Sequence, residues 1–270
     1  MTHPHHDYSP AVGTQVRLKD YDPDDTGGLS KEEALEEFSK LHEDMNRLQE
    51  MLYAQGKHSL LVVLQGMDTS GKDGTIKHVF DYVNPIGVRI ASFKAPTPQE
   101  LSYDFLWRIH QQVPPKGYIG IFNRSHYEDV LVVRVNELVP KAVWQQRYDQ
   151  INTFERLLAE TGTTILKFYL HISKDEQKQR LEARLADPEK QWKFSTGDLP
   201  VREKWAAYMD AYEDALTRCN TEQARWHIVP ANVKWYRNLV ISRTIVHALK
   251  KMDLQFPPPE PGLDKVVIPD

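Results

Sequence analysis

The sequence predicts an α/β protein with a five-stranded parallel sheet covered by helices on both faces. Short apolar segments alternate with segments of helical periodicity, and this alternation is typical of parallel sheets. The first apolar segment, Leu60-Leu61-Val62-Val63-Leu64, is apolar at every position, as expected of a strand that is buried on both faces. The other strands are expected at 88–92, 118–122, 164–172 and 226–229.

Capping boxes indicate where three of the helices begin. Ser30-Lys31-Glu32-Glu33 precedes a stripe of apolar residues at three- and four-residue steps, and Gly56 ends that helix. The two other boxes are Thr97-Pro98-Gln99-Glu100 and Ser173-Lys174-Asp175-Glu176. Further helices are expected near 140–160, 199–219 and 233–252.

Composition is that of a globular protein with one main domain. Residues 29–255 form this domain, between an irregular arm at 1–28 and a proline-rich tail at 256–270. The formal net charge of −4 argues against a nucleic-acid binder, and the single cysteine, Cys219, excludes an internal disulfide. Because the chain has neither an apolar run of membrane-spanning length nor an apolar signal core, we expect a cytoplasmic protein without membrane contact.

A phosphate-binding motif follows the first strand. Gly66-Met67-Asp68-Thr69-Ser70-Gly71-Lys72 fits G-x-x-x-x-G-K between a strand and a helix, which predicts a P-loop NTPase-like three-layer α/β/α fold. The glycines let backbone N–H groups face one anion, and the lysine adds a point charge. The alternative is a plain glycine turn. The predicted phosphate ligands are Gly66, Thr69, Ser70, Gly71, Lys72, Asp73 and Gly74.

Two acidic residues of this motif suggest a metal ion. Asp73 stands where a P-loop usually carries a Ser or Thr that binds Mg²⁺, and Asp68 lies inside the loop. A carboxylate beside a phosphate needs a cation between them, so Asp68 is expected to hold Mg²⁺. Asp73 is either a second ligand or a first-turn acid that interacts with the helix dipole.

A second candidate segment, Asn123-Arg124-Ser125-His126-Tyr127-Glu128-Asp129, follows the third strand. Ligands of such sheets bind beyond the carboxyl ends of the strands. The planar guanidinium of Arg124 suits two phosphate oxygens, and Asp129 is a candidate Mg²⁺ ligand. Glu128 is either a site residue or the last member of a capping box that begins at Ser125.

A third group of basic residues lies in the second half of the chain. Arg180 and Arg184 are four residues apart and therefore neighbours on one helix face, and Lys190 and Lys193 follow. In a phosphate-transfer enzyme such a segment is typical of a lid that brings cations over the reacting phosphates. The alternative is a solvated helix, because charges of both signs are interleaved there.

Together these motifs resemble the polyphosphate kinase 2 family over about Val16 to Ile268. The matching stretches are Gly66-x-Asp68-x-x-Gly71-Lys72-Asp73-Gly74, Phe122-Asn123-Arg124-Ser125-x-Tyr127-Glu128-Asp129, and Arg180-x-x-x-Arg184 followed by Trp192-Lys193-Phe194-Ser195-x-x-Asp198. The resemblance implies a thymidylate-kinase-like domain with a helical lid at about 173–205 and a basic channel for polyphosphate. It also implies dependence on Mg²⁺, with Mn²⁺ as an alternative, and a homo-oligomer, with a tetramer favoured. Glu128 resembles the subclass, class III, that acts on both AMP and ADP.

The predicted activity is a reversible transfer of phosphate from inorganic polyphosphate to AMP and ADP. Adenine nucleotides are the expected acceptors, with guanine nucleotides as an alternative. The predicted catalytic residues are Asp68, Lys72, Arg124, Glu128 and Asp129, with Asp68 and Asp129 on the metal and Lys94, Arg124 and Glu128 on the nucleotide. No general base is needed, because the acceptor phosphate is already ionised. The alternatives are an ATP-dependent nucleoside monophosphate kinase and a non-catalytic nucleotide-binding module.

Overall fold

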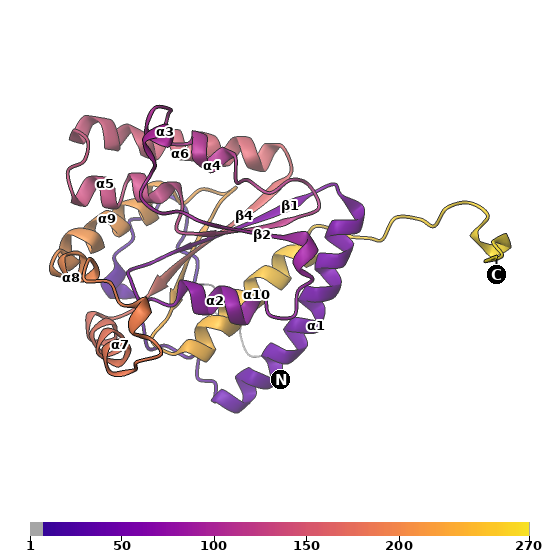
Figure 1. Ribbon diagram of the computed structural model, residues 1–270, viewed down its shortest axis with the longest axis horizontal. Helices are drawn as coiled ribbons and strands as arrows, with labels where there is room; N and C mark the ends of the chain where they lie inside the picture. The colour runs from indigo at the N-terminus through magenta and orange to yellow at the C-terminus, as the bar shows by residue number, and fades with distance from the viewer. Residues whose placement is uncertain (1–7, 270) are drawn as a thin grey trace.

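A five-stranded parallel sheet forms the centre of the computed structural model, which describes residues 8–269 (Figure 1). The strand order is β2-β3-β1-β4-β5, and every neighbouring pair is parallel. The predicted fold class is therefore confirmed. The strands are β1 (Ser59–Gln65), β2 (Val88–Ser92), β3 (Ile119–Asn123), β4 (Thr163–His171) and β5 (Trp226–Pro230).

The central strand β1 contributes to both hydrophobic cores, because alternate side chains point to opposite faces of a sheet. Leu61 and Val63 belong to one buried cluster, whereas Leu60, Val62 and Leu64 belong to the other. All seven residues of β1 are buried, which accounts for the uninterrupted apolar run in the sequence.

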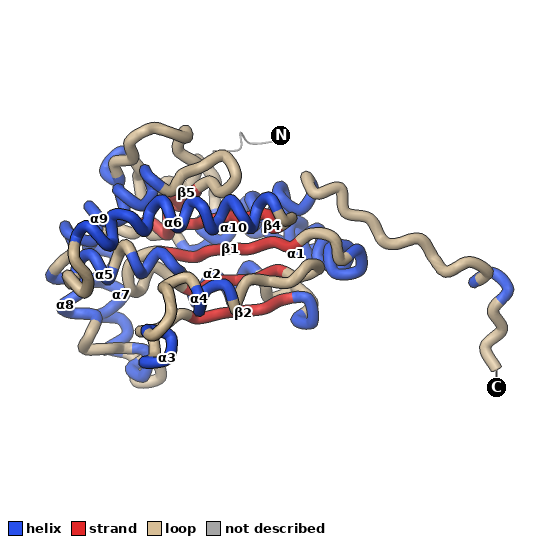
Figure 2. The backbone as a smooth tube through the Cα atoms, turned by 90° about the horizontal axis from the view of Figure 1, so that it is seen from above, coloured by secondary structure: helices blue, strands red, loops and turns tan. Residues whose placement is uncertain are grey.

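Helices cover both faces of the sheet (Figures 1 and 2). One cluster joins the sheet to α6 (Lys141–Glu160) and α9 (Trp205–Arg218), and the other joins it to α1 (Lys31–Gln55), α2 (Lys72–Val79) and α10 (Lys234–Lys250). The other helices are α3 (Pro98–Leu101), α4 (Trp107–His110), α5 (Val132–Val135), α7 (Lys174–Ala186) and α8 (Asp198–Glu203). Short 3-10 turns lie at Leu18–Asp20, Pro85–Gly87, His126–Asp129, Gln191–Lys193 and Leu263–Lys265.

Capping residues determine where α1 begins and ends and where α3 and α7 begin. Ser30 and Glu33 form the reciprocal capping box that the sequence predicts, and Gly56 closes the helix in the left-handed conformation with φ of 62°. Thr97 and Glu100 form the second box at α3. Ser173 caps α7 by accepting from the backbone N–H of Glu176, but the third predicted box is only half formed, because the Glu176 carboxylate pairs with Arg180 at 2.7 Å.

One expected helix is divided. The periodicity at 199–219 suggests a single helix, but α8 and α9 meet at Lys204, whose ψ of 20° departs from helical geometry. Its ammonium donates to Asn136 Oδ1 at 2.7 Å. Trp205, directly after the break, packs against both hydrophobic clusters, so tertiary packing overrides the local pattern.

The N-terminal segment of the described chain packs against the domain, whereas the C-terminal tail leads away from it. In the N-terminal segment Val16 and Leu18 are buried, and the hydroxyl groups of Tyr8 and Tyr236 lie 2.7 Å apart. The first seven residues of the predicted arm lie outside the described residues. The tail beyond α10 leads away from the domain (Figures 1 and 2). Across residues 8–269, none of the helices combines the length and apolar character needed to cross a membrane.

The topology determines where a site can form. β1 lies between β3 and β4, so the chain passes to one side of β1 for β2 and β3 and to the other side for β4 and β5. Ligands of such sheets bind beyond the carboxyl ends of the strands at this switch point. The segments after β1, β2 and β3 meet there.

Candidate active site

The turn after β1 has the shape of a phosphate-binding loop. Thr69 and Gly71 have positive φ values of 65° and 104°, and Gly66 has φ of 151°. At Gly66 an added Cβ would lie 2.8 Å from Ser70 Oγ and 2.9 Å from a backbone oxygen of β4, so only glycine fits. Gly71 is the N-cap residue of α2, which begins at Lys72.

Lys72 is buried and lacks an acidic partner. Its ammonium donates to the backbone oxygens of Gly66 at 2.7 Å and Met67 at 3.2 Å, and it takes part in none of the ion pairs among residues 8–269. Burial, and after it the charge of Arg124, lowers the pKa of Lys72 to about 8. A bound phosphate would supply the missing negative charge.

Two arginines hold this loop from behind. Arg180 was expected to approach phosphate, but it donates to the backbone oxygens of Thr69 (2.9 Å) and Ser70 (3.2 Å), and further to two backbone oxygens after β5. Arg237, which is 2% exposed, donates to the oxygen of Ser70 at 3.3 Å. Burial and the neighbouring Arg180 lower the pKa of Arg237 to about 9. These contacts fix the carbonyl side of the loop.

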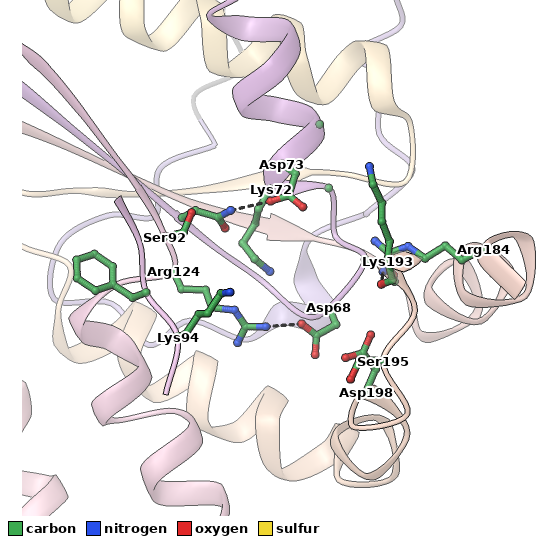
Figure 3. A pocket seen from close by; sticks show the side chains of 15 residues that line it. Asp68, Lys72, Asp73, Ser92, Lys94, Arg124, Arg184, Lys193, Ser195 and Asp198 are labelled. Carbon is green, nitrogen blue, oxygen red and sulfur yellow. Dashed lines mark hydrogen bonds and ion pairs between the residues drawn. The ribbon is translucent and has the colours of Figure 1, made fainter. Parts of the chain in front are cut away.

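A cavity of about 430 Å³ opens over the loop (Figure 3). Five cationic and three acidic side chains contribute to its wall, so the balance suits a polyanion. The lining residues are Asp68, Thr69, Gly71, Lys72, Asp73, Gly74, Ser92, Phe93, Lys94, Asn123, Arg124, Arg184, Lys193, Ser195 and Asp198.

Arg124 projects into this cavity from an unusual backbone conformation. Its φ of 63° is left-handed, which few non-glycine residues adopt. The guanidinium lies 2.5 Å from Asp68 Oδ1 and 3.3 Å from Glu128 Oε2 (Figure 3 shows the first contact). Burial opposes the charged form, but the carboxylates of Glu128 and Asp68 outweigh it and raise the pKa of Arg124.

Glu128 is a partner of Arg124 and does not form the capping box that was its structural alternative. Ser125 Oγ accepts from the backbone N–H of Tyr127 at 3.2 Å, and the Glu128 carboxylate faces Arg124. The amide of Gln65, oriented to donate to Glu128 Oε1 at 3.1 Å, supports the carboxylate from β1. Glu128 therefore acts on the cavity through Arg124 and is not itself among the lining residues.

Besides Arg180 and Glu128, two further predicted side chains, those of Asp129 and Lys190, lie away from the cavity, and the loop residues Gly66 and Ser70 are not among its lining residues. The Asp129 carboxylate pairs with Arg147 NH1 at 2.9 Å, and burial raises the pKa of Asp129 although Arg147 opposes this effect. Lys190 pairs with Asp187 at 2.5 Å on the exposed surface. Neither residue lines the cavity.

Asp198 is the carboxylate that the predicted site set omitted. It comes from the first turn of α8 and lies beside Asp68 at the cavity wall (Figure 3). Burial, followed by the negative charge of Asp68, raises the pKa of Asp198. Its place in the run Trp192 to Asp198, which carried part of the family resemblance, was the available signal.

The carboxylate arrangement suits a divalent cation that is shared with phosphate. In residues 8–269 no group of three His, Cys, Asp or Glu side chains forms a complete protein site for a metal. Mg²⁺ needs only one or two carboxylates when substrate phosphates complete its coordination. Asp68 and Asp198 would provide such a pair, because a cation would offset the burial and the charge of Asp68 that raise the pKa of Asp198. Asp73, by contrast, accepts from Asn123 Nδ2 at 2.6 Å.

Residues 28–257 match the polyphosphate kinase 2 (PPK2) family. The chain belongs to this family. It is a polyphosphate kinase, and the family resemblance seen in the sequence is confirmed.

Relatives of known name match over almost the whole chain. An AMP/ADP-polyphosphate phosphotransferase of Meiothermus ruber is 58% identical over 256 residues, which cover 94% of this chain and 96% of the relative. An ADP-polyphosphate phosphotransferase of Rhodopseudomonas palustris is 42% identical and covers 88% and 87%. The crystal structure of polyphosphate kinase 2 from Arthrobacter aurescens TC1 has a TM-score of 0.91 at 45% identity and covers 94% and 92%.

Gly71→Ala should disable the loop. The new Cβ would lie 1.9 Å from Arg237 NH1 and would occupy a backbone conformation with φ of 104°. We expect the affinity for tripolyphosphate, measured by calorimetry, to fall by about tenfold or more, since a distorted loop loses oriented donors. Gly56→Ala is the matched control, because its φ is also positive but nothing lies within 4 Å of the added Cβ. Equal affinities of both variants and the unmodified enzyme would contradict this role of Gly71.

Proposed function

We propose that the enzyme transfers the terminal phosphoryl group of inorganic polyphosphate to AMP and to ADP. An oxygen of the acceptor's terminal phosphate attacks the terminal phosphorus of polyphosphate. The bridging P–O bond breaks, and the shortened polyphosphate leaves with the bonding electrons on its oxygen. One phosphoanhydride is formed for each one broken, so the reaction runs in both directions.

The observation that carries this proposal is the charge distribution of the cavity. Lys72 and Arg124 lie on the sheet side, whereas Arg184 comes from the last turn of α7 and Lys193 from the 3-10 turn between α7 and α8 (Figure 3). Two polyanions that meet between these groups have their mutual repulsion neutralised from both sides. The names of the relatives from Meiothermus ruber and Rhodopseudomonas palustris agree with polyphosphate and adenosine phosphates as these polyanions.

The protein's own groups position the reactants. Lys72 and the loop N–H groups bind one phosphate, and Arg124 orients a second with Asp68 and Glu128 as its supports. Asp68 and Asp198 would hold Mg²⁺, which when bound neutralises phosphate charge. Residues 173–205 act as the lid in this proposal, since Arg184, Lys193 and Asp198 reach the cavity from there. Lys94, two residues beyond the end of β2, contacts the nucleotide.

Polyphosphate and AMP alone should yield ADP and then ATP when no ATP is supplied. Lys72→Ala should lower turnover at least 10²-fold, because it removes a preorganised charge at the reacting phosphates. Lys77→Ala on the exposed side of α2 is the matched control and should stay within twofold of the unmodified enzyme. A strict requirement for ATP, or a Lys72→Ala variant within threefold of the unmodified enzyme, would refute the proposal.

Glu128→Gln should reduce phosphorylation of AMP more than that of ADP. The change keeps the side-chain length and removes the charge that holds Arg124. ADP carries a further phosphate for other contacts, so the shorter acceptor depends more on Arg124. We expect kcat/KM for AMP to fall at least tenfold more than that for ADP, about 1.4 kcal/mol of transition-state binding. Equal losses for the two acceptors would show that Glu128 does not select between them.

Asp68→Asn and Asp198→Asn should each raise the Mg²⁺ concentration that gives half-maximal activity, by about tenfold for the loss of one carboxylate ligand. Asp129→Asn is the informative comparison, because Arg147 already holds its carboxylate. It should leave the Mg²⁺ requirement unchanged. If Asp129→Asn shifts the requirement and Asp198→Asn does not, the Asp68–Asp129 pair predicted from the sequence is the correct ligand set.

A further inference from the structure

A fully buried ion pair lies behind the segment that carries Arg124 and Glu128. Lys167 on β4 is 0% exposed and Glu155 on α6 is 1% exposed, and Lys167 Nζ lies 2.6 Å from Glu155 Oε2. Neither residue lines the cavity over the phosphate loop. The chemistry proposed above makes no use of them.

The pair forms hydrogen bonds with His126 and Tyr127, which belong to the segment from Arg124 to Glu128, here called the site segment. Lys167 Nζ also donates to Tyr127 Oη at 2.8 Å and to the backbone oxygen of Cys219 at 2.6 Å, so each of its three protons has an acceptor. Glu155 Oε1 accepts from Tyr127 Oη at 2.8 Å and lies 3.1 Å from His126 Nε2. All four side chains are buried.

The direction of these hydrogen bonds follows from the charge of Glu155. Burial opposes ionisation, but the ammonium of Lys167 and the hydrogen bond from His126 outweigh it, and the pKa of Glu155 lies below its ordinary value. An ionised carboxylate only accepts, so both His126 and Tyr127 donate to it. The site segment is therefore held by two donors on one acceptor.

Stability alone gives little reason for such a pair. Desolvation of two charges cancels most of their attraction, and apolar residues of similar volume often stabilise a core as well. Here the pair borders an apolar cluster, and Lys167 Nζ lies 5.0 Å from the ring centroid of Trp226, a member of that cluster. What the ion pair adds to this core is a fixed set of directions for His126 and Tyr127.

Those directions matter because of the neighbouring backbone. Arg124 has the left-handed φ of 63°, and Ser125 follows in an extended conformation. A left-handed non-glycine residue persists only where its surroundings hold it. His126 and Tyr127 lie between Arg124 and Glu128 in the sequence, and their anchors fix the backbone from which both site residues project.

We propose that Glu155 and Lys167 are positioning residues for phosphoryl transfer, because through His126 and Tyr127 they keep Arg124 directed into the cavity and paired with Glu128. This inference rests on the proposed function for its activity readout. It assigns no contact with substrate to Glu155, Lys167 or Tyr127. Their effect on the reaction passes through Arg124.

Two variants test the proposal. Tyr127→Phe removes only the hydroxyl that joins the segment to the ion pair, and it should lower kcat about tenfold. The double variant Glu155→Gln/Lys167→Met removes both charges at nearly constant volume, and it should lower kcat about 100-fold. A cooperative thermal melt checks that each variant is folded, and Tyr127→Phe carries the test if the double variant does not fold.

Tyr148→Phe is the matched control. Tyr148 is equally buried in the same cluster, lies on the same helix as Glu155, and its hydroxyl accepts from Arg134 at 3.3 Å, away from the site segment. Its kcat should stay within twofold of the unmodified enzyme. A tenfold loss here would mean that any buried hydroxyl in this core matters, which overturns the proposal.

A double-mutant cycle separates positioning from general packing. In an Arg124→Ala background, Tyr127→Phe should have no further effect on kcat or on tripolyphosphate affinity measured by calorimetry. Losses that multiply would overturn the proposal, as would Tyr127→Phe and the double variant both within threefold of the unmodified enzyme. The calorimetric arm needs no turnover, so it tests the inference even if the unmodified enzyme fails to phosphorylate AMP or ADP with polyphosphate.

Discussion

A buried ammonium without an acidic partner is the constraint on which the site depends. Within residues 8–269, Lys72 has only two backbone oxygens as hydrogen-bond partners, and desolvation favours its neutral form. At neutral pH the ammonium stays charged, so its burial is unfavourable until an anion arrives. A polyphosphate chain offers such anions in series, and this explains why a protein with a net charge of −4 can bind it. The positive electrostatic potential that attracts phosphate is confined to the surroundings of Lys72 and does not follow from the net charge of the protein.

The remaining architecture keeps this potential directed at one place. Arg180 and Arg237 donate hydrogen bonds to carbonyl oxygens of the loop from behind. The loop therefore cannot turn these oxygens toward a phosphate. In front, Asp68 and Glu128 orient Arg124, and in the proposed arrangement a cation on Asp68 would add charge there. The same residue types thus serve two purposes. Arginines behind the loop give it its shape, whereas in the proposed arrangement the arginines in front of it would contact the substrates.

The structural elements that could be predicted from the sequence are those determined by residues close together in the chain. The five strands, the capping box at Ser30 and the loop from Gly66 to Lys72 each follow from a short local pattern, and the structure confirms these elements. The pairing of Asp129 with Arg147 joins residues 18 apart, and the contact of Arg180 with Thr69 joins residues 111 apart. No local pattern encodes such pairs. Glu155 and Lys167 are likewise of residue types that are usually exposed to solvent. Only the packing of α6 on β4 shows that they are buried.

The pKa of Lys72 is the measurement that tests this account most directly. The side-chain carbon next to the ammonium can be followed by NMR through a pH titration, and a Lys72→Met sample identifies its signal. We expect a pKa of about 8 in the free enzyme. Tripolyphosphate should raise it toward the ordinary lysine value of about 10.4, because the phosphate stabilises the charged form. Binding should accordingly weaken as the pH rises through 8. An ordinary pKa in the free enzyme, or a low pKa that tripolyphosphate leaves unchanged, would contradict the account.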